Sequence, residues 1–284
     1  MKLTDKLKEF EKQKSIHEND NHTLRMNHII EDCKNISKTL VAMNPHFTCH
    51  DIRHSIAIIE ILDDLCEDLL DDTNKLSLNY NEVFCLLASC YLHDTGMILS
   101  KDTDEAKVKE RRDIENKPYL SIGDLRRREH HSRSAEYIFE HKKTLQLNIH
   151  LATIIGKICK GHRKVDLNDD EFNDVILTNE IVRVRLLAAL LRLADELDLS
   201  YTRIPRDFEE IFNAEKNFEF LSQIHFIKHL YTSGIVIGLE QIGNDRIKTI
   251  NISLRVPNKE YERRMNAIIR GPIVREINYT RPIL

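Results

Sequence analysis

The chain has 284 residues, of which 41% are hydrophobic and 31% are charged, a balance that supports a large buried core. Its 42 basic and 46 acidic residues give a net charge of −4, which argues against bulk nucleic-acid binding but not against a local basic patch. No apolar run reaches the roughly 18 residues of a membrane span, so we expect a cytoplasmic protein without membrane association. The six cysteines are scattered without a C-x-x-C pair, which indicates buried thiols in a reducing compartment.

Hydrophobic periodicity predicts a helical protein, and the low counts of 8 glycines and 6 prolines agree with few tight turns. The predicted helices cover residues 1–44 (as one or two helices), 50–70, 79–92, 130–141, 150–162 and 180–199. The helices over 79–92 and 180–199 are apolar on nearly every side, which is typical of buried, central helices. Residues 97–128 are crowded with charge and lack a core face. We expect a long loop there with one short helix, of the kind that acts as a lid or binding element.

The pattern changes after Pro205. A short helix is predicted over 207–216, followed by two strands over 233–241 and 246–256 that a turn at 243–245 joins into a hairpin. A last helix is predicted over 259–269. The predicted fold class is therefore mainly α, with a small C-terminal α+β appendix that contains a β-hairpin. The predicted units are N-terminal helices at 1–45 that pack on the body, a helical domain at 46–204, and the appendix at 205–284.

Several histidines and aspartates lie at or near the predicted buried helices. They are His50, His54, His93, Asp94, His130, His162 and Asp195. Burying an unpaired carboxylate costs several kcal/mol, and neighbouring imidazolium ions would repel one another. Neutral imidazoles and ionised carboxylates around a divalent metal ion solve both problems. A lone buried histidine is more often a hydrogen-bonded core residue, so composition alone leaves both interpretations open.

The order of these residues resembles the HD superfamily of metal-dependent phosphohydrolases, whose pattern is H…HD…H…H…D on a helical bundle, and in particular its HD/phosphodiesterase-like domains of bacterial type. Five segments carry the resemblance: FTCHDIRHS (47–55), YLHDTGM (91–97), EHHSRSA (129–135), ICKGH (158–162) and LRLAD (191–195). The third segment selects His130 rather than His131. The resemblance covers residues 46–205 and implies an HD-type helical bundle.

The resemblance implies a divalent-metal site with one or two ions. The first metal would be held by His54, His93, Asp94 and Asp195, and Asp94 could bridge to a second ion held by His130 and His162. In a one-metal site the last two histidines would face the substrate instead. Nitrogen and oxygen ligands suit Mn, Fe, Zn or Mg and do not choose among them.

His50 precedes His54 by four residues, so both would share one helix face. Related cyclic-nucleotide phosphodiesterases have H-N-x-x-H at this place, where the first histidine donates a proton. Here Asp51 replaces the asparagine. For His50, a catalytic role and a supporting role behind the metal ligands both stay open.

The implied activity is hydrolysis of a nucleotide or related phosphoester by a metal-activated water, with Asp94 and His50 as catalytic residues. Cations that could bind the small phosphorylated substrate are Arg53, Lys160 and Arg163, with Arg126, Arg127 and Arg128 on the predicted loop. Two alternatives are a non-catalytic signalling or interaction module with a structural or vestigial metal centre, and a single-strand nuclease. The appendix could bind a protein partner or a second copy, and His225 and His229 could belong to that surface.

Overall fold

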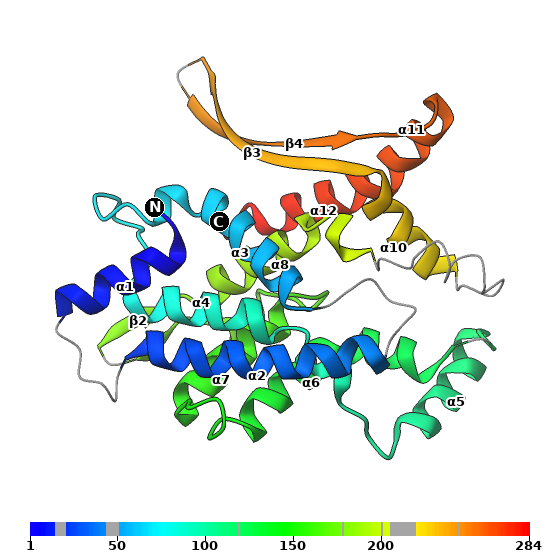
Figure 1. Cartoon of the computed structure of the whole chain (residues 1–284), viewed down its shortest axis with the longest axis horizontal. Helices are drawn as coiled ribbons and strands as arrows, with labels where there is room; N and C mark the ends of the chain where they lie inside the picture. The colour runs from blue at the N-terminus through cyan, green and yellow to red at the C-terminus, as the bar shows by residue number, and fades with distance from the viewer. Residues whose placement is uncertain are drawn as a thin grey trace.

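The computed structural model describes residues 1–14, 21–43, 51–118, 120–177, 179–199, 201–204, 220–243 and 245–284. The longer helices before residue 200 are α1 (Leu3–Lys14), α2 (His22–Met43), α3 (Ile52–Leu65), α4 (Tyr80–Leu92), α5 (Asp104–Glu115), α6 (Ile122–Glu140), α7 (Ile149–Gly161) and α8 (Val184–Leu197) (Figure 1). Short elements between them are η2 (Glu67–Leu69), η3 (Thr95–Ile98), η4 (Asp170–Phe172), β1 (Val175–Leu177), β2 (Glu180–Val182) and, after α8, η5 (Tyr201–Arg203). The C-terminal part contains α10 (Phe220–Tyr231), β3 (Thr232–Ile242), β4 (Asp245–Leu254), α11 (Lys259–Met265), the π-helical turn η6 (Asn266–Arg270) and α12 (Gly271–Thr280).

Helices α4 and α8 form the centre of the core. α4 begins with a capping box, in which Asn79 Oδ1 accepts from the Glu82 N–H at 3.0 Å and the Glu82 carboxylate accepts from the Asn79 N–H at 3.1 Å. Every residue of α4 from 83 to 90 is buried, because α1, α2, α3, α7 and α8 all contact this helix. Residues 187–194 of α8 are buried in the same way. The predicted fold class is confirmed: the chain is mainly helical, with a small C-terminal antiparallel sheet of two strands.

Two glycines allow backbone segments to approach closely. A Cβ on Gly96 would lie 2.2 Å from the carbonyl oxygen of His130 and 2.4 Å from the nitrogen of Ser134, both in the backbone of α6. The Gly96 N–H instead donates to Ser134 Oγ at 2.8 Å. A Cβ on Gly161 would lie 2.6 Å from the Cβ of Ala188 in α8. The turn after α4 is therefore held against α6, and the end of α7 against α8.

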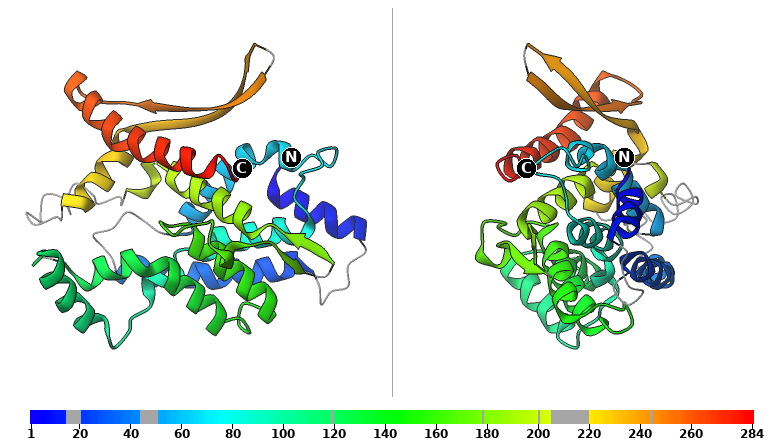
Figure 2. Two further views of the ribbon diagram at one scale, coloured as in Figure 1. Left: turned by 180° about the vertical axis from the view of Figure 1, so that it is seen from behind. Right: turned by 90° about the vertical axis from the view of Figure 1, so that its left-hand side faces the viewer.

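The C-terminal part combines a long hairpin with helices that pack on the body. Strands β3 and β4 pair antiparallel, with Ile237 opposite Ile250, and the hairpin lies over α12 and extends beyond it (Figures 1 and 2). Its apolar face packs against α11, η6 and α12. α12 in turn contacts α8, where Arg192 Nε lies 3.3 Å from a Glu276 carboxylate oxygen and the Arg192 guanidinium lies 4.8 Å from the ring centre of Tyr279.

Residues 97–128 differ most from the prediction of a long loop. They contain η3 and the 12-residue helix α5, and α6 begins at Ile122 behind a capping box formed by Ser121 and Asp124. Arg133 of α6 holds α5 through two hydrogen bonds to the Asp104 carboxylate, at 2.6 and 2.9 Å. One short helix was predicted in this segment, but because a buried ion pair rather than a broad apolar face anchors α5, hydrophobic periodicity did not indicate its position or its length.

Two other predicted helices have different limits. The helix predicted over 180–199 begins at Val184, because 180–182 form β2, which pairs with β1, and three-residue strands are too short to show alternation. The last helix continues past Gly271 to Thr280 through the π-helical turn, with a proline in the first turn of α12, where its missing N–H is tolerated. The hairpin prediction is confirmed, whereas the helix predicted over 207–216 lies outside the described residues. The division into three units stays a prediction.

Among the described residues, no helix combines the length and the apolar character needed to cross a membrane.

Candidate metal centre

Five helices, two of them through the residues at their C-terminal ends, bring a cluster of histidines and aspartates to one point. His54 lies in the first turn of α3, His93 ends α4 and Asp94 follows it, and His162 ends α7. The remaining two members of the cluster lie within helices: His130 is in α6 and Asp195 in α8. His54, His93, His130 and His162 are all less than 5% exposed.

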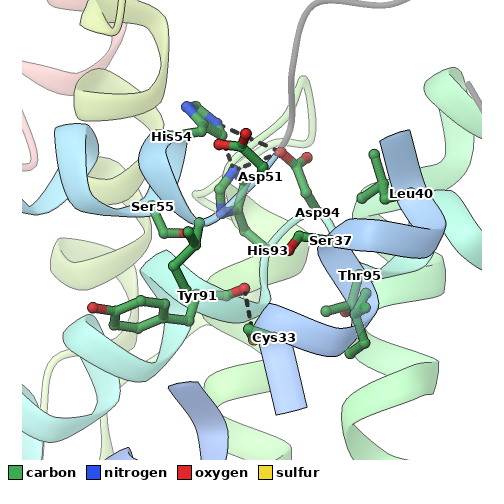
Figure 3. A pocket seen from close by; sticks show the side chains of 12 residues that line it. Cys33, Ser37, Leu40, Asp51, His54, Ser55, Tyr91, His93, Asp94 and Thr95 are labelled. Carbon is green, nitrogen blue, oxygen red and sulfur yellow. Dashed lines mark hydrogen bonds and ion pairs between the residues drawn. The ribbon is translucent and has the colours of Figure 1, made fainter. Parts of the chain in front are cut away.

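One half of the cluster contains His54, His93, Asp94 and Asp195. His54 Nε2 lies 3.2 Å from Asp195 Oδ1 and 3.2 Å from His93 Nε2. His93 Nε2 lies 3.1 Å from Asp94 Oδ2. Figure 3 shows the side chains of His54, His93 and Asp94 turned toward one another. The atoms that face each other are therefore imidazole nitrogens and carboxylate oxygens.

The other half contains His130 and His162, whose Nε2 atoms lie 2.9 Å apart. His130 Nε2 lies 3.2 Å from Asp94 Oδ1. Asp94 thus directs one carboxylate oxygen at each half of the cluster. His131 points elsewhere: its ring centre lies 6.1 Å from that of His130, with the two planes at 89°.

The second nitrogen of every histidine in the cluster is held by an acceptor. Nδ1 of His93 contacts the carbonyl oxygen of Cys90 at 3.0 Å, and Nδ1 of His130 contacts that of Arg127 at 2.7 Å. Nδ1 of His162 meets the carbonyl oxygen of Cys159 in the same way. A carbonyl oxygen can only accept, so Nδ1 carries the hydrogen and Nε2 presents a lone pair to the centre. This is the tautomer in which a histidine binds a metal ion through Nε2.

His54 is held by a carboxylate instead. Its Nδ1 lies 2.6 Å from Asp198 Oδ2, and Asp198 is only 2% exposed. A carboxylate behind a ligating histidine orients the ring and increases its basicity. Sequence reasoning missed Asp198. A signal was present, since Asp198 follows Asp195 by three residues at the end of the buried helix α8.

The electrostatics of the cluster favour the ligating forms of His130, His162 and Asp195, and a protonated His54. Burial lowers the pKa of His130 to about 4 and the pKa of His162 well below its usual value, so both are neutral at pH 7. Burial would raise the pKa of Asp195, but the hydrogen bond from His54 and the other histidines hold it well below its usual value. Burial would lower the pKa of His54, but three carboxylates outweigh burial and raise it to about 10. These ionised carboxylates require a cation, which a proton on His54 or a metal ion can supply.

The donor atoms fit a divalent metal. In two groups, His54–His93–Asp195 and His93–Asp94–His162, one ligand atom from each residue lies within 4.8 Å of the others. Clustered imidazole nitrogens and carboxylate oxygens could bind a divalent ion, and this donor set does not select one metal.

A polar pocket borders the cluster on the side of Asp94, His130 and Asp195. Arg127 and Arg163 line it, as do two residues that the sequence did not single out, Arg203 of η5 and Lys228 of α10. His229, for which the sequence left a place on a partner surface open, also lines this pocket. Neither Arg203 nor Lys228 belongs to a recognisable motif, so the sequence offers no signal for their placement.

The other predicted cations have partners away from this pocket. Arg53 contacts the Asp51 carboxylate at 2.6 Å, and Lys160 contacts Glu171 at 2.7 Å. Arg126 donates to Ser100, and Arg128 pairs with Glu115 at 2.7 Å. His50 lies outside the described residues, as does the side chain of His225.

The fold and the cluster define a mainly helical protein whose buried histidines and aspartates could hold a divalent metal. The family model HD-CE matches residues 45–278, so the chain belongs to the HD-CE family. The match contains all six residues of the cluster and continues through β3 and β4 into α12. Comparisons with curated proteins and with solved structures returned no match.

Proposed function

We propose that the protein is an HD-type, metal-dependent phosphohydrolase that hydrolyses a nucleotide or a related phosphoester. One observation carries the proposal: histidines from different helices direct Nε2 at a common centre, while an acceptor behind each ring holds Nδ1. A buried core histidine that is only structural has no reason to share a centre with three other rings and two carboxylates. The HD-CE match over most of the chain supports the same interpretation.

Six residues would hold the metal. The half with His54, His93, Asp94 and Asp195 would bind one ion, and His130 and His162 would bind a second that shares Asp94. A bound divalent ion would polarise the phosphoryl oxygen and activate a water molecule for attack on phosphorus. The two carboxylate oxygens of Asp94 face the two halves of the cluster, which is the arrangement that a bridging ligand needs.

The other residues would position the reactants. Asp198 would fix the orientation of the His54 ring through its 2.6 Å contact with Nδ1. Arg127 and Arg163 line the pocket beside Asp94 and would bind the oxygens of the phosphoryl group. His50 is proposed as the proton donor to the leaving oxygen from the sequence resemblance alone. The helical spacing expected between His50 and His54 does not support this role, because α3 begins only at Ile52 and Asp51 is its N-cap.

The test is hydrolysis by the manganese-loaded protein and by the same protein after treatment with a chelator. The substrates are bis(p-nitrophenyl) phosphate, a panel of nucleotides and single-stranded oligonucleotides. We expect turnover with metal, loss on chelation, and a decrease of at least about a hundredfold in Asp94→Asn. Asp113→Asn is the matched control, because Asp113 is an exposed residue of α5 away from the cluster.

The other outcomes identify the alternatives. Bound metal without turnover on the whole panel would indicate a non-catalytic module with a structural metal centre. Cleavage confined to oligonucleotides would indicate a single-strand nuclease.

A further inference from the structure

The polar pocket beside the metal centre gathers cations from four separate parts of the chain. They are Arg127 of α6, Arg163 just after α7, Arg203 of η5 and Lys228 of α10. Three members of the metal cluster, Asp94, His130 and Asp195, line the same pocket. Lys228 lies beyond residue 205, so the C-terminal part of the chain contributes a charge to this site.

Neighbouring cations perturb two members of this group, Arg127 and Lys228. Burial, Arg163 and Arg203 lower the pKa of Arg127 to about 10. Burial lowers the pKa of Lys228. Arg203 and Arg127 lower this pKa further, whereas Glu196 raises it. Such mutual repulsion shows that the charges form one electrostatic cluster rather than four isolated surface groups.

The carboxylates that line the pocket do not balance these charges once a metal is bound. Among the described lining residues, the carboxylates are Asp94, Asp195 and Glu196, one fewer than the four cations. Burial and the neighbouring Arg203 and Lys228 lower the pKa of His229 to about 2, so it is neutral and changes nothing in this comparison. A single divalent ion at the cluster would add two positive charges and a second ion two more.

The ion pair between Lys228 and Glu196 is long. Lys228 Nζ lies 3.7 Å from Glu196 Oε1, which exceeds the range of a good hydrogen bond. Phosphate oxygens offer arginine a planar, two-point contact and offer lysine a point charge, so both residue types suit one polyanionic ligand.

We infer that the pocket binds a ligand with two or more linked phosphate groups, of the class of nucleoside diphosphates and triphosphates. The inference rests on the proposed function and narrows its substrate. A cyclic mononucleotide carries a single negative charge, whereas a nucleoside triphosphate carries about four at pH 7, which matches the excess of cations around the metal centre far better. Arg127, Arg163, Arg203 and Lys228 are the proposed phosphate contacts.

The test measures binding rather than turnover. Inorganic tripolyphosphate, orthophosphate and a 3′,5′-cyclic nucleotide are titrated calorimetrically into the full chain after removal of metal, because polyphosphates themselves chelate divalent ions. We expect tripolyphosphate to bind at least about tenfold more tightly than the other two, with an advantage that shrinks as salt is added. A nucleoside triphosphate in a parallel titration shows whether the base and sugar add affinity.

Two variants keep the test independent of folding. Lys228→Gln and Arg163→Gln should each weaken tripolyphosphate binding by roughly tenfold, the loss expected for one charge-assisted contact. Lys228→Gln should leave orthophosphate binding within about twofold, whereas Arg163→Gln should weaken orthophosphate binding as well, because Arg163 is a proposed contact to the phosphoryl group itself. Arg163 is only partly buried, so its replacement does not threaten the core. Lys164→Gln removes the same charge from the next residue, which is exposed, and should change neither affinity.

Different results would contradict this inference and the proposed function. Metal-dependent hydrolysis of bis(p-nitrophenyl) phosphate without a preference for tripolyphosphate would overturn this inference and leave the proposed function intact. Equal effects of Lys228→Gln and Lys164→Gln would overturn it as well, as would an oligonucleotide that displaces tripolyphosphate at lower concentration. Tripolyphosphate binding in a protein that takes up no metal would support the pocket and contradict the proposed function.

Discussion

The substitution Asp198→Asn tests a buried residue that orients a proposed metal ligand but does not bind the metal itself. The Asp198 carboxylate lies 2.6 Å from His54 Nδ1 and is 2% exposed, so its hydrogen bond is shielded from water. Asparagine keeps the shape and can still accept the Nδ1 hydrogen, but it removes the negative charge behind the ring. Loss of such a support weakens metal binding by about 10- to 100-fold, or roughly 1.4–2.7 kcal/mol.

The assay is competition for Mn²⁺ between the protein and a fluorescent chelator of known affinity. Asp113→Asn, an exposed carboxylate on α5, serves as the control and should leave the affinity unchanged. Because Asp198 acts through His54, hydrolysis by Asp198→Asn should recover most of its wild-type rate at saturating metal. An affinity within about twofold of wild type, in a variant that is folded by circular dichroism, would refute the role assigned to Asp198.

Three further predictions concern stability. Gly96→Ala should lower the free energy of unfolding by about 1–3 kcal/mol or more in urea titrations, because the new Cβ would collide with backbone atoms of α6. Asp104→Asn should destabilise the protein near neutral pH and much less in acid. The hydrogen bonds from Arg133 lower the pKa of Asp104, so this contribution is complete above the unfolded pKa of about 3.9 and is lost as the pH falls through the lower folded value. Adding metal at about 100 times its dissociation constant should increase the free energy of unfolding by about 2.7 kcal/mol, measured as a higher Tm that EDTA reverses.

Each of the three has its own control. Gly238 lies in β3, and its added Cβ would make only an ordinary contact with Thr249 Oγ1 at 3.7 Å, so Gly238→Ala should be neutral or stabilising by up to about 1 kcal/mol. A destabilisation equal to that of Gly96→Ala would contradict the packing argument. For Asp104, an effect that stays constant from pH 2.5 to 7 would show that its charge is not involved. For metal, the Asp94→Asn variant should gain much less stability than wild type.

The helices that carry the metal cluster could be predicted because their signals are local. α4 and α8 are apolar on nearly every side, which marks a central helix whatever the rest of the fold does. The histidines at the ends of α4 and α7, and His130 rather than His131 in α6, follow from short segments that resemble a known pattern. The structure places these residues together at one point.

The features that escaped prediction depend on contacts between distant segments. A short helix was predicted within residues 97–128, but not the position of α5, which has only a narrow buried face and is held by the pairing of Asp104 with Arg133, 29 residues apart. Lys228 has the sequence signature of an ordinary surface lysine, and only the packing of α10 brings it to the pocket with Arg203. Asp198 was predictable only in part. Its spacing from Asp195 can be read from the sequence, but its contact with His54 joins residues 144 positions apart.

The central claim is that six side chains from distant segments hold a metal ion. The most direct measurement is anomalous diffraction at the manganese edge from crystals grown with manganese. We predict one peak among the Nε2 atoms of His54 and His93 and the carboxylates of Asp94 and Asp195, or two peaks with the second beside His130 and His162. A saturated crystal with no peak at this cluster, or with manganese bound only elsewhere, would contradict the claim.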